Sequence, residues 1–325
     1  MRQSYLYNTI NTSLLVILAG VIFVSGCQHS DGRMGHIEQK AEAMHPALRV
    51  ADKHPAVEIM SRFIYLEESD VVVSIIPYSV DLMALNLLSQ NKDIDLVKRY
   101  LLWHLDHLNY PVDNLGLTAT IYDYEVDLQL NEKSLEYYDS SDSYSAMFLL
   151  LLNKYYKKTG DSEIIISNRA KLEDIAYNIV ALMNKDGLTI AKADYKIEYL
   201  MDNSEVYGGL NAFVEICMAF NWDVADYYAK MANNVKTGIL QTFYSTRQIL
   251  HWARDKETVS PSSWGKFYPD AYAQLMPLMH GVLDDFPELE QSLWENFNLH
   301  HAKSIENAEV VQKIVYYFAK QAMER

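Results

Sequence analysis

The stretch Ser143–Asn184, SYSAMFLLLLNKYYKKTGDSEIIISNRAKLEDIAYNIVALMN, decides the fold. Its first part predicts a helix from Ser143 to Lys158, because apolar residues recur three and four positions apart on one face: Tyr144, Met147, Phe148, Leu151, Leu152 and Tyr155. Gly160 then stands where glycine commonly ends a helix. The periodic run Ser162–Asn184 predicts a return helix. The stretch therefore predicts one antiparallel helix pair.

The same helical spacing recurs along most of the chain. It predicts helices over Ile37–Leu66 with interruptions near Pro46 and Pro55, Tyr78–Leu88, Asp93–Leu108, Glu205–Phe220, Val224–Phe243, Ser263–Gly281, Asp285–His300 and Glu306–Arg325. Strand-like pieces are few: Ala119–Leu128, and a possible hairpin of Gly187–Ala193 with Tyr195–Met201. We therefore predict an all-α fold, an (α/α)6-type toroid of antiparallel helix pairs with short β-hairpins in the connections. Without an exact sequence repeat, this prediction rests on counting helices, and the N-terminal helix is the expected partner of the last one.

The beginning of the chain predicts export. The apolar run Ser13–Cys27 follows the basic Arg2 and is shorter than the roughly 20 residues that span a bilayer, which disfavours an uncleaved anchor helix. Its end, Val24-Ser25-Gly26-Cys27, resembles a bacterial lipobox, which implies cleavage before Cys27 and acylation of its thiol. Gln28 in place of Asp favours the outer membrane by the same resemblance. We expect a signal peptide over 1–26, a tether over 27–36 and a single domain over 37–325.

Composition narrows the class of protein. Half of the residues are hydrophobic, so the mature chain has enough apolar surface for a large core. Cys217 would be the second and last cysteine, in an apolar helical pattern, so no disulfide framework is expected. The 43 acidic residues outnumber the 28 basic ones, which argues against nucleic acid as a partner. A polyanionic sugar would also be repelled, unless a local basic groove overcame the net charge. The 24 tyrosines suit sugar rings but are equally ordinary core residues.

Three connections combine acids and aromatic residues with the start of a predicted helix. In the first, Tyr137–Ala146, one of Asp139, Ser141 and Asp142 is expected to cap the helix that follows. Capping leaves the other acid and the neighbouring tyrosines Tyr138 and Tyr144 without an explanation. These residues are therefore candidates for a binding site.

The second connection is Tyr199–Leu210, which contains Asp202, Glu205 and Tyr207. The two acids have the spacing of a capping box, and we consider capping the better explanation for Glu205. The pair Gly208-Gly209 is unfavourable within a helix, which predicts that another helix or a ligand approaches the backbone there.

The third connection is Trp264–Pro277. Pro269 suits the first turn of a helix, and Asp270 would lie just inside that turn, where the helix dipole favours a carboxylate. Aromatic residues cluster around this acid, among them Trp264, Phe267, Tyr268 and Tyr272. This clustering favours an aromatic-lined cleft over a plain first-turn acid.

The three connections resemble the corresponding parts of the six-hairpin (α/α)6-barrel glycosidase superfamily, nearest to its inverting endoglucanase and chitosanase families. The resemblance rests on the turn Tyr138–Tyr144 before an apolar helix and on Tyr268–Gln274, within roughly Tyr78 to Gly281. It implies a carbohydrate cleft at the end of the barrel that holds the helix starts. It also implies that Asp142 contacts a sugar ring and that Asp270 is an acid of the catalytic-base type.

The sequence departs from that resemblance at one place. The families carry a catalytic Glu beside the first barrel helix, whereas here that helix starts as Ile75-Ile-Pro77-Tyr78-Ser79-Val-Asp81. Glu67, Glu68 and Asp70, just upstream, are the nearest acids that could replace it.

From these features we expect a catalytic pair of Asp142 and Asp270, with Asp202 and Glu205 in reserve. An inverting pair would be about 6.5–9.5 Å apart. The expected substrate contacts are Tyr138, Asp139, Tyr144, Tyr207, Trp264, Tyr268 and Tyr272.

The sequence predicts neither a metal nor a cofactor. His104 and His107 share a helix face and His300-His301 are adjacent, but neither pair has a third ligand at suitable spacing. We expect an envelope-anchored protein that binds a polysaccharide or oligosaccharide and hydrolyses it by inverting carboxylate chemistry. A non-catalytic lipoprotein that holds a glycan or a partner for exopolysaccharide export is the alternative. A polysaccharide lyase ranks last, because Arg is scarce near the three connections.

Overall fold

The structure is a computed structural model that describes residues 54–65, 72–245 and 249–325. The predicted signal peptide, the lipidation site Cys27, the tether, and the acids Glu67, Glu68 and Asp70 lie outside the described residues. Within the described ranges, no helix combines the length and the apolar character that a membrane span requires.

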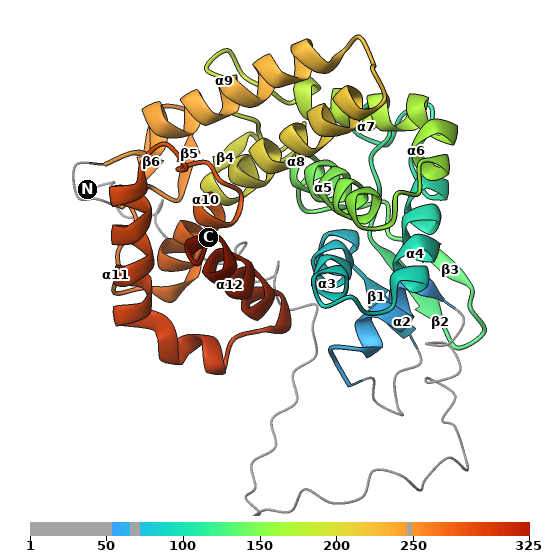
Figure 1. The fold of residues 1–325 in the computed structure, drawn as a ribbon, viewed down its shortest axis with the longest axis horizontal. Helices are drawn as coiled ribbons and strands as arrows, with labels where there is room; N and C mark the ends of the chain where they lie inside the picture. The colour runs from blue at the N-terminus through green and yellow to red at the C-terminus, as the bar shows by residue number, and fades with distance from the viewer. Residues whose placement is uncertain (1–53, 66–71, 246–248) are drawn as a thin grey trace, which may run out of the picture.

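Helices form two concentric layers around a ring (Figure 1). In the described part of the chain the inner layer contains α3 (Pro77–Ser89), α5 (Ser141–Thr159), α8 (Leu200–Ala219), α10 (Leu275–Met279) and α12 (Val310–Met323). Each inner helix contacts the next one, and α12 contacts α3 to close the ring. The outer layer contains α2 (Pro55–Ser61), α4 (Ile94–Asp106), α6 (Glu163–Ser167), α7 (Arg169–Ala181), α9 (Ala225–Phe243) and α11 (Pro287–Glu306). The predicted all-α toroid of antiparallel pairs is confirmed.

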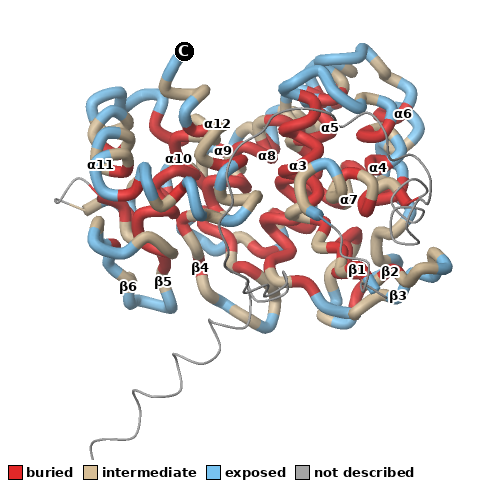
Figure 2. Tube along the Cα trace, turned by 90° about the horizontal axis from the view of Figure 1, so that it is seen from below, coloured by how far each residue is buried: buried red, intermediate tan, exposed pale blue. Residues whose placement is uncertain are grey.

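The composition of the helices explains their layer. Helix α5 carries Met147, Phe148 and Leu149 on successive faces, and all three are fully buried. A helix that is apolar all round is stable only inside other helices, so α5 belongs to the inner ring. The outer helices expose one face, which Figure 2 shows as pale segments around a buried centre. Gly160 ends α5 with a φ of 70°, as predicted, and Cys217 is buried in α8.

Two adjacent glycines let α8 pack directly on its neighbours. A Cβ added to Gly209 would lie 2.5 Å from the Cα of Ala146 in α5, and a Cβ on Gly208 would overlap the ring of His280. Real side chains do not approach so closely, so only glycine permits this contact. The predicted close approach is confirmed, and the approaching group is a helix at Gly209.

Two small antiparallel sheets cover one end of the ring (Figure 2). The first has the order β1 (Val72–Ile75), β2 (Tyr124–Asp127), β3 (Glu132–Ser134), and the second the order β4 (Ile197–Tyr199), β5 (Ala253–Asp255), β6 (Thr258–Ser260). The predicted hairpin around 187–201 is only partly right. Its two halves meet in a single bridge, Lys192 with Tyr195, and β4 pairs with β5 instead. This pairing places Arg254 opposite the buried Glu198.

Several predicted helix bounds need correction. The segment Ser263–Gly281 is broken into a π-helical turn, Phe267–Ala271, a 3-10 turn, Tyr272–Gln274, and the short α10. Pro269 and Pro277 explain the break, because proline removes a backbone donor and clashes with the preceding turn. The predicted return helix Ser162–Asn184 is divided at Asn168 into α6 and α7.

The last helix completes the ring. Helix α12 contacts the inner helix α3, whereas most of the Ile37–Leu66 helix that was its expected partner lies outside the described residues. Of that predicted helix, the described part contains only α2, which packs in the outer layer on α3 and α4.

Candidate functional site

Four carboxyl groups gather where α5 and α8 begin. Asp142 and Glu205 are buried, whereas Asp139 and Asp202 are partly exposed. The four come from two segments about sixty residues apart, because the alternation of inner and outer helices brings the starts of the inner helices to the same end of the ring. Asp202 experiences the negative charge of Asp142, Glu205 and Asp139, so the four acids form one electrostatic cluster.

Asp142 is held by donors on both of its carboxyl oxygens. Its Oδ1 accepts the backbone N–H of Ser143 at 2.8 Å and the hydroxyl of Ser140 at 2.6 Å. Its Oδ2 accepts the hydroxyl of Thr189 at 2.6 Å. Burial nevertheless raises the pKa of Asp142 to about 6, because these donors only partly offset the loss of solvent.

Ser140 bridges two acids. Its Oγ lies 2.6 Å from Oδ1 of Asp142 and 2.8 Å from Oδ2 of Asp202. A hydroxyl has a single proton, so one of these two short contacts needs a proton from a carboxyl group. Burial, and then the charges of Asp142 and Glu205, raise the pKa of Asp202 well above its ordinary value. Asp202 is therefore the acid that holds the additional proton.

Glu205 lies deeper, between α8, α5 and α3. It accepts the hydroxyl of Tyr78 on Oε1 at 2.6 Å and the hydroxyl of Ser143 on Oε2. Burial raises the pKa of Glu205 to about 7, although both hydroxyls favour its ionised form. Tyr78 stands at the start of α3, where the resemblance led us to expect a Glu, and it contributes a neutral donor in place of an acid.

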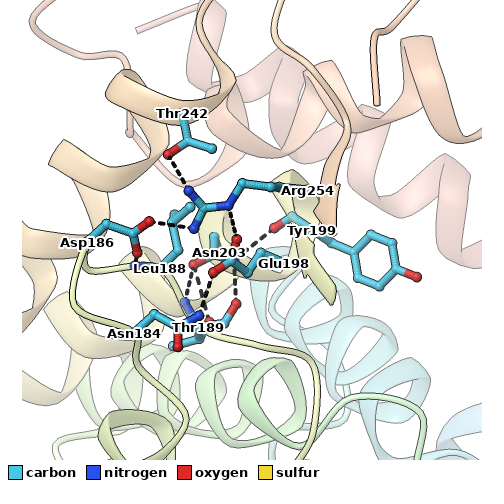
Figure 3. A network of polar contacts seen from close by, with 9 residues as sticks. All are labelled: Asn184, Asp186, Leu188, Thr189, Glu198, Tyr199, Asn203, Thr242 and Arg254. Carbon is cyan, nitrogen blue, oxygen red and sulfur yellow. Dashed lines mark hydrogen bonds and ion pairs between the residues drawn. The ribbon is translucent and has the colours of Figure 1, made fainter. Parts of the chain in front are cut away.

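A polar network holds the loop that carries Thr189 (Figure 3). Asn203 donates to the carbonyl oxygens of Thr189 and Tyr199, both at 3.0 Å, and accepts the N–H of Thr189 at 2.8 Å. One layer further out, Arg254 forms ion pairs with Glu198 and Asp186. The network joins β4, β5 and α8, and it fixes the donor that Asp142 uses.

A pocket of about 70 Å³ opens beside the acids. It is lined by Asp139, Ser140, Ala191, Tyr195, Tyr199, Met201, Asp202, Trp252, Tyr268 and Pro269. Tyr199 and Trp252 stack with ring centroids 6.1 Å apart and an angle of 16° between the rings. The pocket thus places two carboxyl groups next to flat aromatic surfaces.

The expected pair Asp142 and Asp270 does not meet on this pocket. Asp270 accepts the N–H of Ser263 at 3.0 Å and lies 3.4 Å from the ammonium group of Lys266. Neither Asp142 nor Asp270 lines the pocket, whereas Asp139 and Asp202 do. The two residues before Asp270 in sequence, Tyr268 and Pro269, do reach the pocket wall.

The capping predictions for these segments are wrong. The N-cap of α5 is Ser140, and its hydroxyl makes no cap bond because it is bound to the two acids. Helix α8 begins at Leu200, so Asp202 and Glu205 lie inside the helix and form no capping box. Helix capping therefore does not explain why acids stand in these two segments.

The other predicted binding residues divide between the pocket and the core. Tyr138 donates to Asp113 at 2.7 Å, and Tyr144 donates to Asp123 at 3.0 Å, so both are buried structural residues. The remaining three are placed as follows: Tyr272 is buried next to Tyr268, the ring of Tyr207 lies below the ammonium group of Lys236, and Trp264 stacks on His300. Of the predicted substrate contacts, Asp139 and Tyr268 line the pocket.

Sequence reasoning missed several residues of the site. Ser140 was one of several serines in its turn, and Thr189 lies in a segment that we interpreted only as half of a hairpin. Trp252 lies in a segment for which the sequence predicted no site. A polar residue in a strand-like run, such as Thr189 in Gly187–Ala193, is a weak signal on its own. Its role becomes evident only from the fold, which brings Thr189 to Asp142, more than forty positions earlier in the chain.

Three of the histidines contact other residues of the protein. His104 is buried and stacks on Phe148 at a centroid distance of 4.0 Å, and His107 contacts the carboxyl group of Glu132. His301 bonds the carbonyl oxygen of Trp264 at 2.7 Å. Among the residues that the structure describes, no three His, Cys, Asp or Glu side chains are arranged to hold a metal ion.

Comparison with known proteins places the fold. The (α/α)6-type toroid predicted from the sequence is also the fold of two solved structures. Among solved structures, a rhamnosidase from Klebsiella oxytoca with rhamnose bound is similar, with a TM-score of 0.56 and 14% identity over 88% of this chain and 53% of that chain. This chain thus spans about half the length of the rhamnosidase.

A second solved structure matches over nearly its whole length. Endoglucanase Cel10, a family 8 glycosyl hydrolase from Klebsiella pneumoniae, has a TM-score of 0.51 and 11% identity over 83% of this chain and 99% of that chain. No protein-family model and no curated protein matches the sequence. At these identities the likeness shows the fold, and the chemistry must be argued from the site.

Proposed function

We propose that this protein is a carbohydrate-active enzyme that hydrolyses a glycosidic bond, with Asp202 as general acid and Asp139 as general base. The observation that carries the proposal is the pocket that both acids line. Burial raises the pKa of both acids. The charges of Asp142 and Glu205 raise the pKa of Asp202 further, whereas the ammonium group of Lys192 partly offsets the rise at Asp139. Two carboxyl groups in unlike environments are the usual basis of acid and base assignments.

The reaction would use both acids in one step. Asp202 gives its proton to the glycosidic oxygen while a water molecule attacks the anomeric carbon, and Asp139 takes a proton from that water. The bond to the leaving sugar breaks and the anomeric configuration inverts.

The buried acids support this assignment without contacting substrate. Asp142 and Glu205 disfavour a negative charge on Asp202, so they help to keep it protonated near neutral pH. Asp142 therefore acts as a positioning residue in this proposal, and the sequence-based role as one of a catalytic pair with Asp270 is replaced by Asp202 with Asp139.

The aromatic wall favours sugar as the ligand. Tyr195, Tyr199, Trp252 and Tyr268 present flat apolar faces with polar edges next to the carboxyl groups. The fold, shared with glycoside hydrolases, supports the same class. We propose a polysaccharide or oligosaccharide as substrate.

Release of reducing sugars from a panel of glucans and amino-sugar polymers tests the proposal. Asp202→Asn and Asp139→Asn should each reduce kcat by roughly 10²- to 10⁴-fold, the usual effect of general acid–base catalysis. Asp223→Asn, at an exposed acid in the turn between α8 and α9, is the control and should retain full activity. Sugar binding without turnover by the wild type would favour the non-catalytic glycan-binding lipoprotein of an export system.

We further propose that the protein is anchored to the bacterial outer membrane through lipid on Cys27, where it would process exopolysaccharide. The support is the apolar run Ser13–Cys27 and its lipobox-like end. Incorporation of labelled palmitate that is lost in Cys27→Ala, with the protein in the membrane fraction, is the expected result. A soluble, unlabelled full chain would contradict the anchor.

A further inference from the structure

A second and larger cavity, of about 710 Å³, lies at the other end of the ring. Its lining includes Leu88 and Ser89 at the end of α3, Lys158 at the end of α5, and Gln321 and Ala322 at the end of α12. The acids described above lie at the starts of α5 and α8, so the two cavities face opposite ends of the inner helices. Figure 2 shows the C-terminus of the chain on the side away from both sheets. A volume of about 300–1,000 Å³ is typical of small-molecule sites.

Three cationic side chains line this cavity, together with the acid Glu215. Lys154, Lys158 and Arg325 line it, and in the described part of the chain neither Lys154 nor Lys158 has an ion-pair partner. The nearby Lys157, by contrast, pairs with Glu215 at 2.7 Å. Partial burial lowers the pKa of Lys154. The positive charges of Lys157 and Arg325 lower it further, whereas the negative charge of Glu215 partly offsets this effect. An anion beside these cationic side chains would relieve the repulsion.

The lining also offers two further acids and one imidazole nitrogen without a hydrogen-bond partner in the described structure. Asp284 and Glu290 reach the cavity from the segment after α10 and from α11. The Nε2 atom of His280 is buried and has no hydrogen-bond partner in the described structure. Gly208, also in the lining, leaves room for the ring of His280, because a Cβ there would overlap it. Carboxylates and a neutral imidazole suit the hydroxyl groups of a ligand.

We infer that this cavity binds an acidic sugar, with the carboxylate of a uronic acid against Lys154 and Lys158 and its hydroxyl groups facing Asp284, Glu290 and His280. The chain as a whole has a net charge of −15, so local cationic side chains are needed for any anionic ligand. The site is separate from the acid pocket, and its existence does not depend on hydrolysis there.

Isothermal titration calorimetry on the full chain tests the inference with three probes: D-glucuronate, D-glucose and inorganic phosphate. D-Glucuronate should bind, and D-glucose should bind roughly 10- to 100-fold more weakly, because it lacks the group that a charge-assisted hydrogen bond requires. Lys154→Gln and Lys158→Gln should each weaken glucuronate binding by about tenfold or more. Lys133→Gln, an exposed lysine beside Glu125 on β2, is the matched control and should bind like the wild type.

Two further measurements separate this site from the acid pocket. Asp202→Asn should bind glucuronate as the wild type does, and its binding should remain even if no polymer is ever hydrolysed. In ¹⁵N-histidine NMR spectra, glucuronate should shift the signals of His280 and leave those of the outer-layer His107 unchanged.

Three results would overturn the inference. The first is an absence of glucuronate binding, and the second is binding that persists in Lys154→Gln and Lys158→Gln but is lost in Asp202→Asn. The third is phosphate binding without glucuronate binding, which would assign the cavity to a different anion. Circular dichroism of each variant shows that a loss of binding is not a loss of fold.

Discussion

Replacing Glu205 by Gln should stabilise the protein at high pH. Glu205 is 2% exposed, and its pKa rises from 4.5 to about 7 mainly because burial disfavours the carboxylate. An acid with a raised pKa in the folded state binds its proton more tightly there than in the unfolded chain. Its contribution to stability is complete below pH 4.5 and is lost as the pH rises to about 7.

The size of this effect follows from the shift. At 1.36 kcal/mol per pKa unit, a rise from 4.5 to about 7 corresponds to about 3 kcal/mol of unfolding free energy. Gln cannot ionise and can still bond the hydroxyls of Tyr78 and Ser143. The stability of Glu205→Gln relative to the wild type should therefore increase by about 3 kcal/mol between pH 4.5 and pH 8.

Urea unfolding at pH 4.5, 6 and 8 measures the difference directly. The exposed Glu306→Gln is the control and should follow the wild-type pH dependence. The difference in unfolding free energy between Glu205→Gln and the wild type could instead stay constant over this pH range. That result would show that ionisation of Glu205 does not destabilise the folded state. The reasoning from burial would then be refuted.

Two substitutions test the packing and the network around the site. Gly209→Ala should lower the unfolding free energy by about 1–2 kcal/mol, because overpacking against Ala146 outweighs the better helix propensity of alanine; an unchanged or higher urea midpoint would contradict it. Arg254→Met should cost about 3–5 kcal/mol, since it leaves Glu198 buried without its partner. The double variant Arg254→Met, Glu198→Gln should recover part of that loss, because it removes the buried charge of Glu198. If the single and double variants lose the same unfolding free energy, the unpaired charge is not the cause of the loss.

The sequence predicted the ring well because its strongest signals are local. The apolar faces of Tyr78–Leu88 and Val224–Phe243 correspond closely to α3 and α9, and Gly160 ends α5 as expected. The predictions failed where local signals compete. At Ser263–Gly281, helical spacing coexists with Pro269 and Pro277, and the prolines decide the backbone.

The site was harder to predict than the fold because its acids have two possible explanations. Asp202 and Glu205 have capping-box spacing, and only the position of the helix start, at Leu200, excludes capping. The bridge of Ser140 between Asp142 and Asp202 joins residues sixty positions apart, so no local pattern contains it. The sequence analysis singled out three segments, and the structure brings Asp139, Asp202 and Tyr268 from them to one pocket. Asp270 lies outside the lining of that pocket.

The two cavities reflect one property of the toroid. Inner helices alternate with outer ones, so the inner helices run parallel and their dipoles add, with positive ends where α5 and α8 begin. Asp142 and Asp202 lie at those ends, whereas Lys158 and Arg325 lie at the opposite ends, where cations are favoured. The parallel inner helices therefore favour carboxyl groups at one end of the ring and cations at the other. An acidic site for proton transfer and a cationic site for an anion can coexist in one domain because the same backbone stabilises both.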